Sequence, residues 1–406
     1  MRALDRYYDV LVTGAGAAGM VAAVNASSRG RKVLLLEKSD RPGRKITASG
    51  NGRCNLMNSG EFRYYGDPQF AKLVLKACSR DQLTAFFRRH GLLVTEENDG
   101  RIYPMTYQSA TVLSALKKAL EITGVHMETG IAVVSAQQNG DRFLVETANG
   151  QTIESGKLVI ACGGAAQPKL GGTFDGFRIL QNMGHRMIPV KPSLVPLVTD
   201  PKSISGLAGI RIRCCVSLIG DGKTIHNEKG EVLFTDYGIS GICVMQCARF
   251  AVPDKTWLEL DLISGAFPDS GQAVQEMSFR RKHFADSSPV WLLNGILPEK
   301  LSYAVLKQAG MPLRGESAGA ATDRMLEKIT ETACHYRIEI KGTRGFEQAQ
   351  VTAGGIDCRE FNHDTMESRI VPGLYAVGEV LNVDGDCGGF NLMFAFASGW
   401  IAGESV

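Results

Sequence analysis

The residues with the clearest chemical pattern lie within the first forty positions. Gly14, Gly16 and Gly19 follow the spacing G-x-G-x-x-G, and an acid, Glu37, stands eighteen positions after the last glycine. Such glycines serve a tight turn, a close approach of phosphate to bare backbone, and close packing of a helix on a strand, in that order. The helix start adds free N–H groups and partial positive charge, and the acid accepts from ribose hydroxyls. The pattern predicts a dinucleotide site.

The elements that must position these residues are also present, in the required order. Tyr8–Thr13 predicts a short buried strand, residues 20–28 an Ala-rich helix, and residues 32–36 a second strand that ends at the acid. Strand, glycine turn, helix, strand and acid agree, which distinguishes the motif from an ordinary Gly-rich turn. The motif alone does not separate FAD from NAD, although a unit at the extreme N-terminus is common among flavin-binding folds. The cofactor contacts predicted here are Gly14, Ala15, Gly16, Ala18, Gly19, Glu37 and Lys38.

A loop rich in small residues and cations follows the second strand, over residues 41–55. Its cations would compensate a pyrophosphate or a reduced flavin, its glycines would allow backbone contact, and its polar side chains would bond ring edges or substrate. The alternative is a surface loop with solvated charges, although polar Gly-rich loops beside a dinucleotide site favour function. Cys54 is interpreted as structural, with a lowered pKa beside its cationic neighbours as the alternative. The predicted contacts are Arg44, Lys45, Gly50, Gly52, Arg53 and Asn55.

A second polar contact is predicted near the C-terminus. A buried strand over residues 374–377 ends in Gly378-Glu379, and a Gly-rich loop then leads into a helix over residues 393–400. In flavoproteins this arrangement places the acid on the ribityl chain and points the helix start at the flavin N1/O2 edge, where negative charge collects on reduction. The contacts predicted here are Gly378, Glu379, Gly389, Asn391 and Leu392.

These segments, taken together, resemble the BaiN/YhiN-like flavoproteins, a family of NAD(P)/FAD-dependent oxidoreductases also called the aminoacetone-oxidase type. The resemblance is carried by residues 43–45, 50–55, 233–241, 352–356, 365–368 and 378–392, which span nearly the whole chain in the family's order. It implies FAD, with the backbone of Val133 contacting adenine. The other FAD contacts that the resemblance implies are Ala15, Glu37, Arg44, Lys45, Gly50, Gly52, Glu379, Asn391 and Leu392. Asp236 and Cys243 depart from the family pattern, which bears on the substrate.

The implied fold is α/β: a glutathione-reductase-like FAD-binding Rossmann domain interrupted by an α+β insert with a helical subdomain. We expect the FAD domain over residues 1–190 and 343–406, and the insert over 191–342 as a lid over the flavin. Three prolines between 189 and 196 mark the crossing into the insert. Within the insert, hydrophobic alternation predicts strands over 191–264, and helical patterns cover 265–335.

Composition excludes several classes of protein. The chain carries 45 Lys+Arg against 42 Asp+Glu, and a net charge of +3 gives no reason to expect a nucleic-acid partner. The dense basic run Arg280–His283 is interpreted as a solvated helix face rather than a site for nucleic acid or nicotinamide phosphate. The ten cysteines form no Cys-x-x-Cys pair, so neither a metal site nor a redox disulfide is predicted. With no signal peptide or membrane span visible, we expect a cytoplasmic enzyme.

The predicted function is an FAD-dependent oxidoreductase, in the leading form an NAD(P)H-linked reductase or dehydrogenase of a small or hydrophobic organic substrate, steroid-like or bile-acid-like compounds included. Because no second G-x-G-x-x-G occurs, NAD(P)H would bind transiently over the flavin. The alternatives are an oxidase passing electrons from a small amine such as aminoacetone to O2, a flavin-binding redox sensor with little turnover, and, on the basic run alone, a flavin enzyme acting on RNA. No catalytic acid or base is assigned; Asp236 and Tyr237 are loose candidates on the substrate side. The oligomeric state is not predicted.

Overall fold

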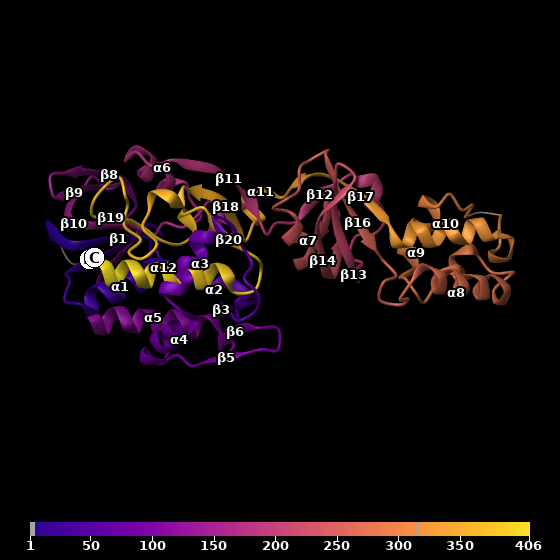
Figure 1. Ribbon diagram of the computed structural model, residues 1–406, viewed down its shortest axis with the longest axis horizontal. Helices are drawn as coiled ribbons and strands as arrows, with labels where there is room; N and C mark the ends of the chain where they lie inside the picture. Colours follow the sequence, from indigo (N-terminus) through magenta and orange to yellow (C-terminus); the bar gives the residue numbers. More distant parts are fainter. Residues whose placement is uncertain (1–4, 314) are drawn as a thin grey trace. The chain divides into compact units, whose positions relative to one another are not determined.

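The computed structural model describes residues 5–313 and 315–406 (Figure 1). They form two compact units: residues up to Pro192 together with Ala349–Val406, and Ser193–Gln348. The second unit is therefore a continuous piece of chain inserted into the first. The segment Thr343–Gln348, which the sequence analysis placed in the returning part, belongs to the inserted unit, and Thr343 pairs there with Leu197.

The first unit is built on a seven-stranded sheet. Its middle consists of apolar runs buried on both faces, the pattern of a parallel sheet covered by helices. Five strands run parallel, and the other two extend the sheet as antiparallel partners. The order is β7 (His126–Thr129), β2 (Val33–Glu37), β1 (Tyr7–Thr13), β10 (Thr152–Ile160), β9 (Arg142–Thr147) and β8 (Val133–Asn139), with β19 (Leu374–Ala376) paired to β10.

Two helices from opposite ends of the chain pack closely on this sheet. They are α1 (Ala17–Ser28) and the C-terminal α12 (Phe390–Ser405), which lie side by side (Figure 1). A Cβ on Gly399 would lie 2.2 Å from the carbonyl oxygen of Ala18, so only glycine permits this approach. The other helices of the unit are α2 (Arg44–Ala48), α3 (Pro68–Ala77), α4 (Arg80–Arg89), α5 (Ser109–Thr123) and α6 (Asp175–Asn182).

Three small sheets tie distant parts of the first unit together. In one, the strand β20 (Val383–Gly385) pairs with β4 (Tyr64–Gly66), and in another β18 (Val351–Ile356) pairs with β11 (Met187–Ser193). The third, β3 (Met57–Asn58), β6 (Arg101–Pro104) and β5 (Val94–Glu96), follows the cation-rich loop directly. The loops at the edge of the main sheet are thereby braced by both halves of the unit.

The inserted unit begins with a closed barrel, where the sequence predicts strands. A two-residue Asp-Gly turn joins its longest strands, since Asp221 and Gly222 both adopt positive φ angles of 50° and 72°, as this hairpin type requires. The barrel order is β12 (Leu197–Thr199), β15 (Gly238–Ser240), β14 (Lys223–Phe234), β13 (Arg211–Gly220), β16 (Thr256–Asp261) and β17 (Tyr336–Thr343), with α7 (Ile242–Cys247) packed on β14.

The rest of the inserted unit is helical: α8 (Ser270–His283), α9 (Glu299–Gln308) and α10 (Asp323–Cys334). The basic run at the end of α8 is only in part the solvated face that the sequence suggested: Lys282 and His283 are exposed, whereas Arg280 and Arg281 are half-buried. Arg280 donates to the carbonyl oxygen of Asn294 at 2.5 Å and pairs with Glu276, while Arg281 donates to the carbonyl of Ala321 at 3.0 Å. Both arginines therefore stabilise the loops between these helices. A loop carbonyl that is removed from water needs a hydrogen-bond donor from the protein, and the guanidinium groups supply it.

Candidate flavin site

The predicted cofactor contacts meet at one edge of the main sheet. Strands β1, β2, β10 and β19 run parallel, so their carboxyl ends lie together, and ligands of open α/β sheets bind at that edge. The glycine turn follows β1, the acid ends β2, and Gly378-Glu379 follows β19. Segments separated by more than three hundred residues therefore contribute to one site.

The three motif glycines have different surroundings. A Cβ on Gly14 would lie 2.5 Å from the carbonyl oxygen of Ala161, and one on Gly19 would lie 1.9 Å from the carbonyl oxygen of Gly14. Gly16, which caps α1, has no atom within 4 Å of the position of a Cβ. Two of the glycines are thus needed by the fold itself, whereas the middle one leaves open space at a helix N-terminus, as a pyrophosphate site requires.

Glu37 is fixed by backbone before any ligand arrives. One carboxylate oxygen accepts from the N–H of Ala15 and the other from the N–H of Ser39, both at 2.8 Å. Each oxygen keeps a further lone pair for a ribose hydroxyl. Ile131 donates its N–H to the carbonyl of Glu37 at 2.9 Å, which brings the start of β8, and with it Val133, beside the end of β2. Lys38 is exposed and lies 3.8 Å from Asp175.

The cation-rich loop adopts an unusual backbone. Gly50, Asn51, Gly52 and Cys54 all have positive φ, between 54° and 83°. Left-handed geometry costs a non-glycine residue roughly 1–2 kcal/mol, and such strain concentrates at binding sites. Burial raises the pKa of the Cys54 thiol to about 11, so its role is structural rather than reactive.

Of the loop's cations, Lys45 is held inward and Arg53 is turned outward. The Lys45 ammonium donates to Glu379 at 2.6 Å, and the other oxygen of Glu379 accepts from the N–H of Thr352 at 2.8 Å. Arg44 at the start of α2 is half-buried, whereas Arg53 is exposed, with its guanidinium 6.0 Å from the ring centre of Tyr107. Lys45 and Glu379 therefore join the two halves of the site.

Thr352 is a site residue that the sequence reasoning did not identify. Its N–H orients Glu379, and its hydroxyl accepts from the N–H of Ala166 at 3.0 Å. The strand β18 that carries it is buried throughout. A buried threonine at the start of an otherwise apolar, Gly-rich strand was the available signal, because a buried hydroxyl needs a partner.

The loop before α12 is docked on the segment after the cation-rich loop. Asn58 donates to the carbonyl of Gly388 at 2.7 Å, and a Cβ on Gly389 would lie 2.3 Å from the carbonyl oxygen of Met57. The Asn391 side chain bonds both backbone groups of Gly385, at 2.8 Å each, so it braces this loop. What Asn391 and the half-buried Leu392 offer a cofactor is thus their backbone, at the start of a helix whose first N–H groups have no partner within the helix.

These features fit a flavin dinucleotide. Two helix starts supply donors for anionic or carbonyl oxygens, a fixed carboxylate stands ready for ribose, and open space remains at Gly16. In addition, the Oδ1 atom of Asn55, a buried residue, has no hydrogen-bond partner among the described residues. Such orphaned atoms are rare in folded proteins and indicate a missing partner.

A comparison with protein families decides the identity. The family model described as the HI0933-like protein Rossmann domain matches residues 8–405, nearly the whole chain. The chain belongs to the HI0933-like family. This confirms the resemblance to the BaiN/YhiN-like flavoproteins, and with it the α/β fold around a Rossmann-type FAD-binding domain. The chain is accordingly an FAD-dependent oxidoreductase.

Two curated relatives match over their full length. The chain is 34% identical to the 3-dehydro-bile acid delta(4,6)-reductase of Clostridium scindens, covering 97% of this chain and 98% of the relative. It is 29% identical to the ribosomal RNA dihydrouridine synthase of Escherichia coli, covering 98% of each. Among solved structures, a 3-ketosteroid-delta4-(5alpha)-dehydrogenase from Rhodococcus jostii aligns with a TM-score of 0.50 at 16% identity, over 100% of this chain and 98% of that one, which shows a shared fold.

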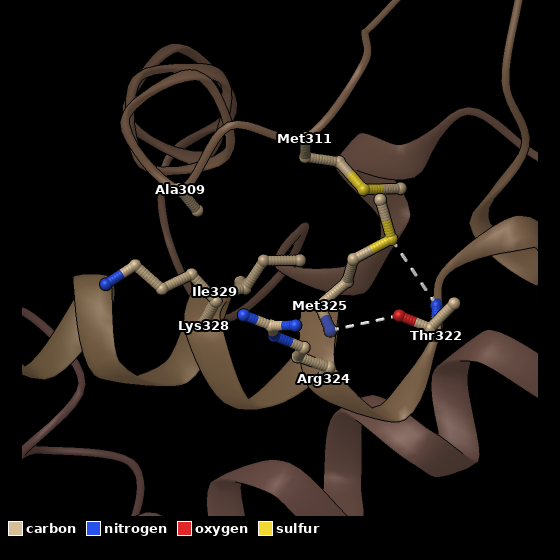
Figure 2. A pocket seen from close by; sticks show the side chains of 7 residues that line it. All are labelled: Ala309, Met311, Thr322, Arg324, Met325, Lys328 and Ile329. Carbon is tan, nitrogen blue, oxygen red and sulfur yellow. Dashed lines mark hydrogen bonds between the residues drawn. The ribbon is translucent and has the colours of Figure 1, made fainter.

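The inserted unit contains a pocket of its own. A pocket of about 250 Å³ lies among the helices of the inserted unit, and its lining includes Arg324, Lys328, Met311 and Ile329 (Figure 2). One wall is the start of α10, capped by Thr322. Residues 5–313 and 315–406 contain no cluster of metal-ligating side chains, and none of their helices is long and apolar enough to cross a membrane.

Proposed function

We propose that this protein uses FAD and NAD(P)H to reduce a carbon–carbon double bond conjugated to a carbonyl group. The observation that carries the proposal is the agreement of two full-length relatives. Their names give unrelated substrates, a bile acid and ribosomal RNA, but the same bond change. A delta(4,6)-reductase saturates an alkene in a 3-oxo steroid, and a dihydrouridine synthase saturates the uracil double bond beside a ring carbonyl.

The site supports this chemistry through binding and electrostatics. Bound FAD, once reduced by NAD(P)H, would supply the hydride. Glu37 and the start of α1 would hold its adenosine and pyrophosphate, and Lys45 with Glu379 would hold the middle of the cofactor. The N–H groups at the start of α12 would stabilise negative charge on the reduced ring. We assign no general acid.

On the substrate side, we assign Arg101 to the carbonyl group. Hydride addition to a conjugated alkene places negative charge on the carbonyl oxygen, which a guanidinium donor stabilises. Arg101 lies opposite Asn58 in the β3–β6 pair, and its Nε is 3.6 Å from the position of a Cβ on Gly388. Its side chain is 31% exposed and pairs with Asp99 at 3.0 Å, so it is oriented and accessible.

Charge distribution favours a small or hydrophobic substrate over RNA. Residues 265–335, the helical part of the insert, contain eight Lys/Arg and eight Asp/Glu residues. Arg280 and Arg281 donate hydrogen bonds to backbone carbonyls within that part. A protein that binds RNA usually carries a cluster of Lys and Arg residues that outnumber the nearby acidic residues. The relationship to two ribosomal RNA dihydrouridine synthases nevertheless makes uridine in RNA the second candidate substrate, contrary to the expectation of no nucleic-acid partner.

The test is an anaerobic absorbance titration of the purified holoprotein. NADH or NADPH should bleach the flavin band, and a 4-en-3-one steroid should restore it, whereas the corresponding saturated ketone, the matched control, should not. Bleaching by aminoacetone with hydrogen peroxide formed in air would instead establish an amine oxidase. Bleaching by none of these donors would leave the redox-sensor alternative. For the second candidate, ribosomal RNA incubated with enzyme and NAD(P)H should gain dihydrouridine, measured by nucleoside mass spectrometry.

A further inference from the structure

Asn55 combines burial with an unsatisfied polar atom. The residue is 7% exposed, and its Oδ1 accepts no hydrogen bond from any described residue. Leaving a buried carboxamide oxygen unpaired is unfavourable, so native structures retain such an atom chiefly where a ligand or water completes it. The unpaired Oδ1 of Asn55 therefore calls for a partner that the described residues do not supply.

The surrounding backbone fixes Asn55 in this place. Cys54, the residue before it, adopts a left-handed φ of 58°, and Gly50 folds back so that a Cβ there would lie 3.1 Å from the N atom of Asn55. On the other side, a Cβ on Gly389 would lie 2.6 Å from Oδ1. Only glycine at 389 therefore lets the Asn55 carboxamide sit against the first turn of α12.

That position determines which part of a flavin the carboxamide would meet. The start of α12 offers N–H donors, which suit the carbonyl oxygens and N1 of the flavin pyrimidine ring. The same ring has an imide edge, in which the N3–H donor stands between two carbonyl oxygens. Helix N–H groups cannot accept from N3–H, so that donor needs a separate acceptor close to the helix start. A carboxamide offers an acceptor and a donor side by side, the complement of an imide edge.

We propose that Asn55 recognises the imide edge of the flavin, with Oδ1 accepting from N3–H and Nδ2 donating to a neighbouring ring carbonyl once the amide turns about its last torsion. The inference rests on the proposed function in requiring that FAD binds at this edge of the sheet. It assigns Asn55 a positioning role, which selects flavin over ring systems that lack an imide edge.

The test compares FAD with 3-methyl-FAD, in which a methyl group replaces the N3 hydrogen. Both are titrated into apoprotein, and binding is followed by flavin fluorescence. The unaltered protein should bind FAD at least about 10-fold more tightly than 3-methyl-FAD, the effect of one lost hydrogen bond that leaves its acceptor unpaired. In Asn55→Ala, FAD should bind about 10-fold more weakly and the preference should shrink to within about 3-fold.

The matched control is Asn51→Gly, which removes the exposed amide from the same loop and relieves its positive φ. It should keep the full preference. An Asn55→Ala protein that folds, judged by circular dichroism, and prefers FAD as strongly as the parent would overturn the proposal. If Asn55→Ala fails to fold, Asn55→Asp decides: its carboxylate should lower the flavin midpoint potential by opposing charge on the reduced ring, and an unchanged potential overturns the proposal. Failure of the unaltered protein to bind FAD would instead refute the proposed function.

Discussion

The sheet edge of the first unit and the helical part of the inserted unit both gather polar groups, but they use them in opposite ways. At the sheet edge, no described atom fills the space beside Gly16, and the Oδ1 of Asn55 has no hydrogen-bond partner among the described residues. In the helical part, the guanidinium groups of Arg280 and Arg281 donate hydrogen bonds to backbone carbonyls of the protein itself. Two arginines of the dense basic run thus serve the fold, so a run of charge does not by itself indicate a binding site.

The largest expected effect separates two glycines of the same turn. Gly19→Ala places a methyl group 1.9 Å from the Gly14 carbonyl, so it should destabilise the protein by about 3 kcal/mol and abolish FAD binding. Gly16→Ala meets no protein atom within 4 Å and should leave apoprotein stability unchanged, yet weaken FAD binding about 100-fold by filling the pyrophosphate position. Urea unfolding and FAD titration measure both quantities.

The control for this pair is Gly342→Ala in β17, which also meets no atom within 4 Å but lies in the inserted unit. It should alter neither quantity. Equal loss of apoprotein stability in the Gly16→Ala and Gly19→Ala variants would contradict the division between a glycine kept for the fold and one kept for the ligand.

An intermediate effect is expected in the inserted unit. Arg280→Ala leaves the Asn294 carbonyl without its charged donor and should lower the free energy of unfolding by about 2 kcal/mol. FAD affinity should not change. Lys282→Ala, two positions along the same helix and exposed, is the control and should stay within about 0.5 kcal/mol of the parent. The opposite ranking of these two variants in urea would restore the interpretation of the run as a solvated face.

The smallest effect is a pH dependence within the first unit. His185 is buried between Glu360, at 2.8 Å from Nδ1, and the Ser368 hydroxyl, at 3.0 Å from Nε2. Burial lowers the pKa of His185 from 6.5, although Glu360 opposes the shift. The folded state therefore holds the neutral ring, and the stability present above pH 6.5 is lost as the pH falls through the lower folded pKa.

Melting temperatures between pH 7 and 5 test this effect. His185→Gln keeps a hydrogen-bonding side chain without a titrating ring, so its melting temperature should fall less steeply with acid than that of the parent. Parallel curves would show that His185 does not set the slope. The Ser368 hydroxyl accepts hydrogen bonds from the backbone N–H groups of Ile370 and Val371. These bonds indicate that the cluster stabilises the fold and is not a hydrolytic site.

Local sequence patterns were sufficient for much of this architecture. The glycine spacing, the acid at the end of β2 and the alternation that predicts strands in the insert each depend on neighbouring residues, so they were visible in the sequence. Long-range contacts were not. The partners of Arg280, the orienting role of Thr352 and the inward bracing by Asn391 depend on which loops meet in space, and no local spacing encodes that meeting.

The site shows the same division. Its residue types could be predicted, because a dinucleotide constrains glycine, acid and helix within a short stretch. The role of each side chain could not be predicted. Glu37 and Asn391 both stand at predicted positions, yet Glu37 keeps lone pairs for a ligand, whereas Asn391 uses its amide to hold the loop. The unpaired oxygen of Asn55 becomes visible only when the loops are in place.

The split of the first unit around its insert has a consequence for synthesis on the ribosome. Ser193–Gln348 emerges as an uninterrupted piece and can finish folding, whereas β10 must wait for β19, and α1 must wait for α12. At about 5–20 residues per second, the wait of β10 lasts on the order of 10 to 40 s and that of α1 on the order of 20 to 70 s. During this time the nascent chain exposes an open parallel strand and the apolar flank of a helix, so chaperone protection belongs to the period of synthesis, whereas FAD loading belongs after α12 has emerged.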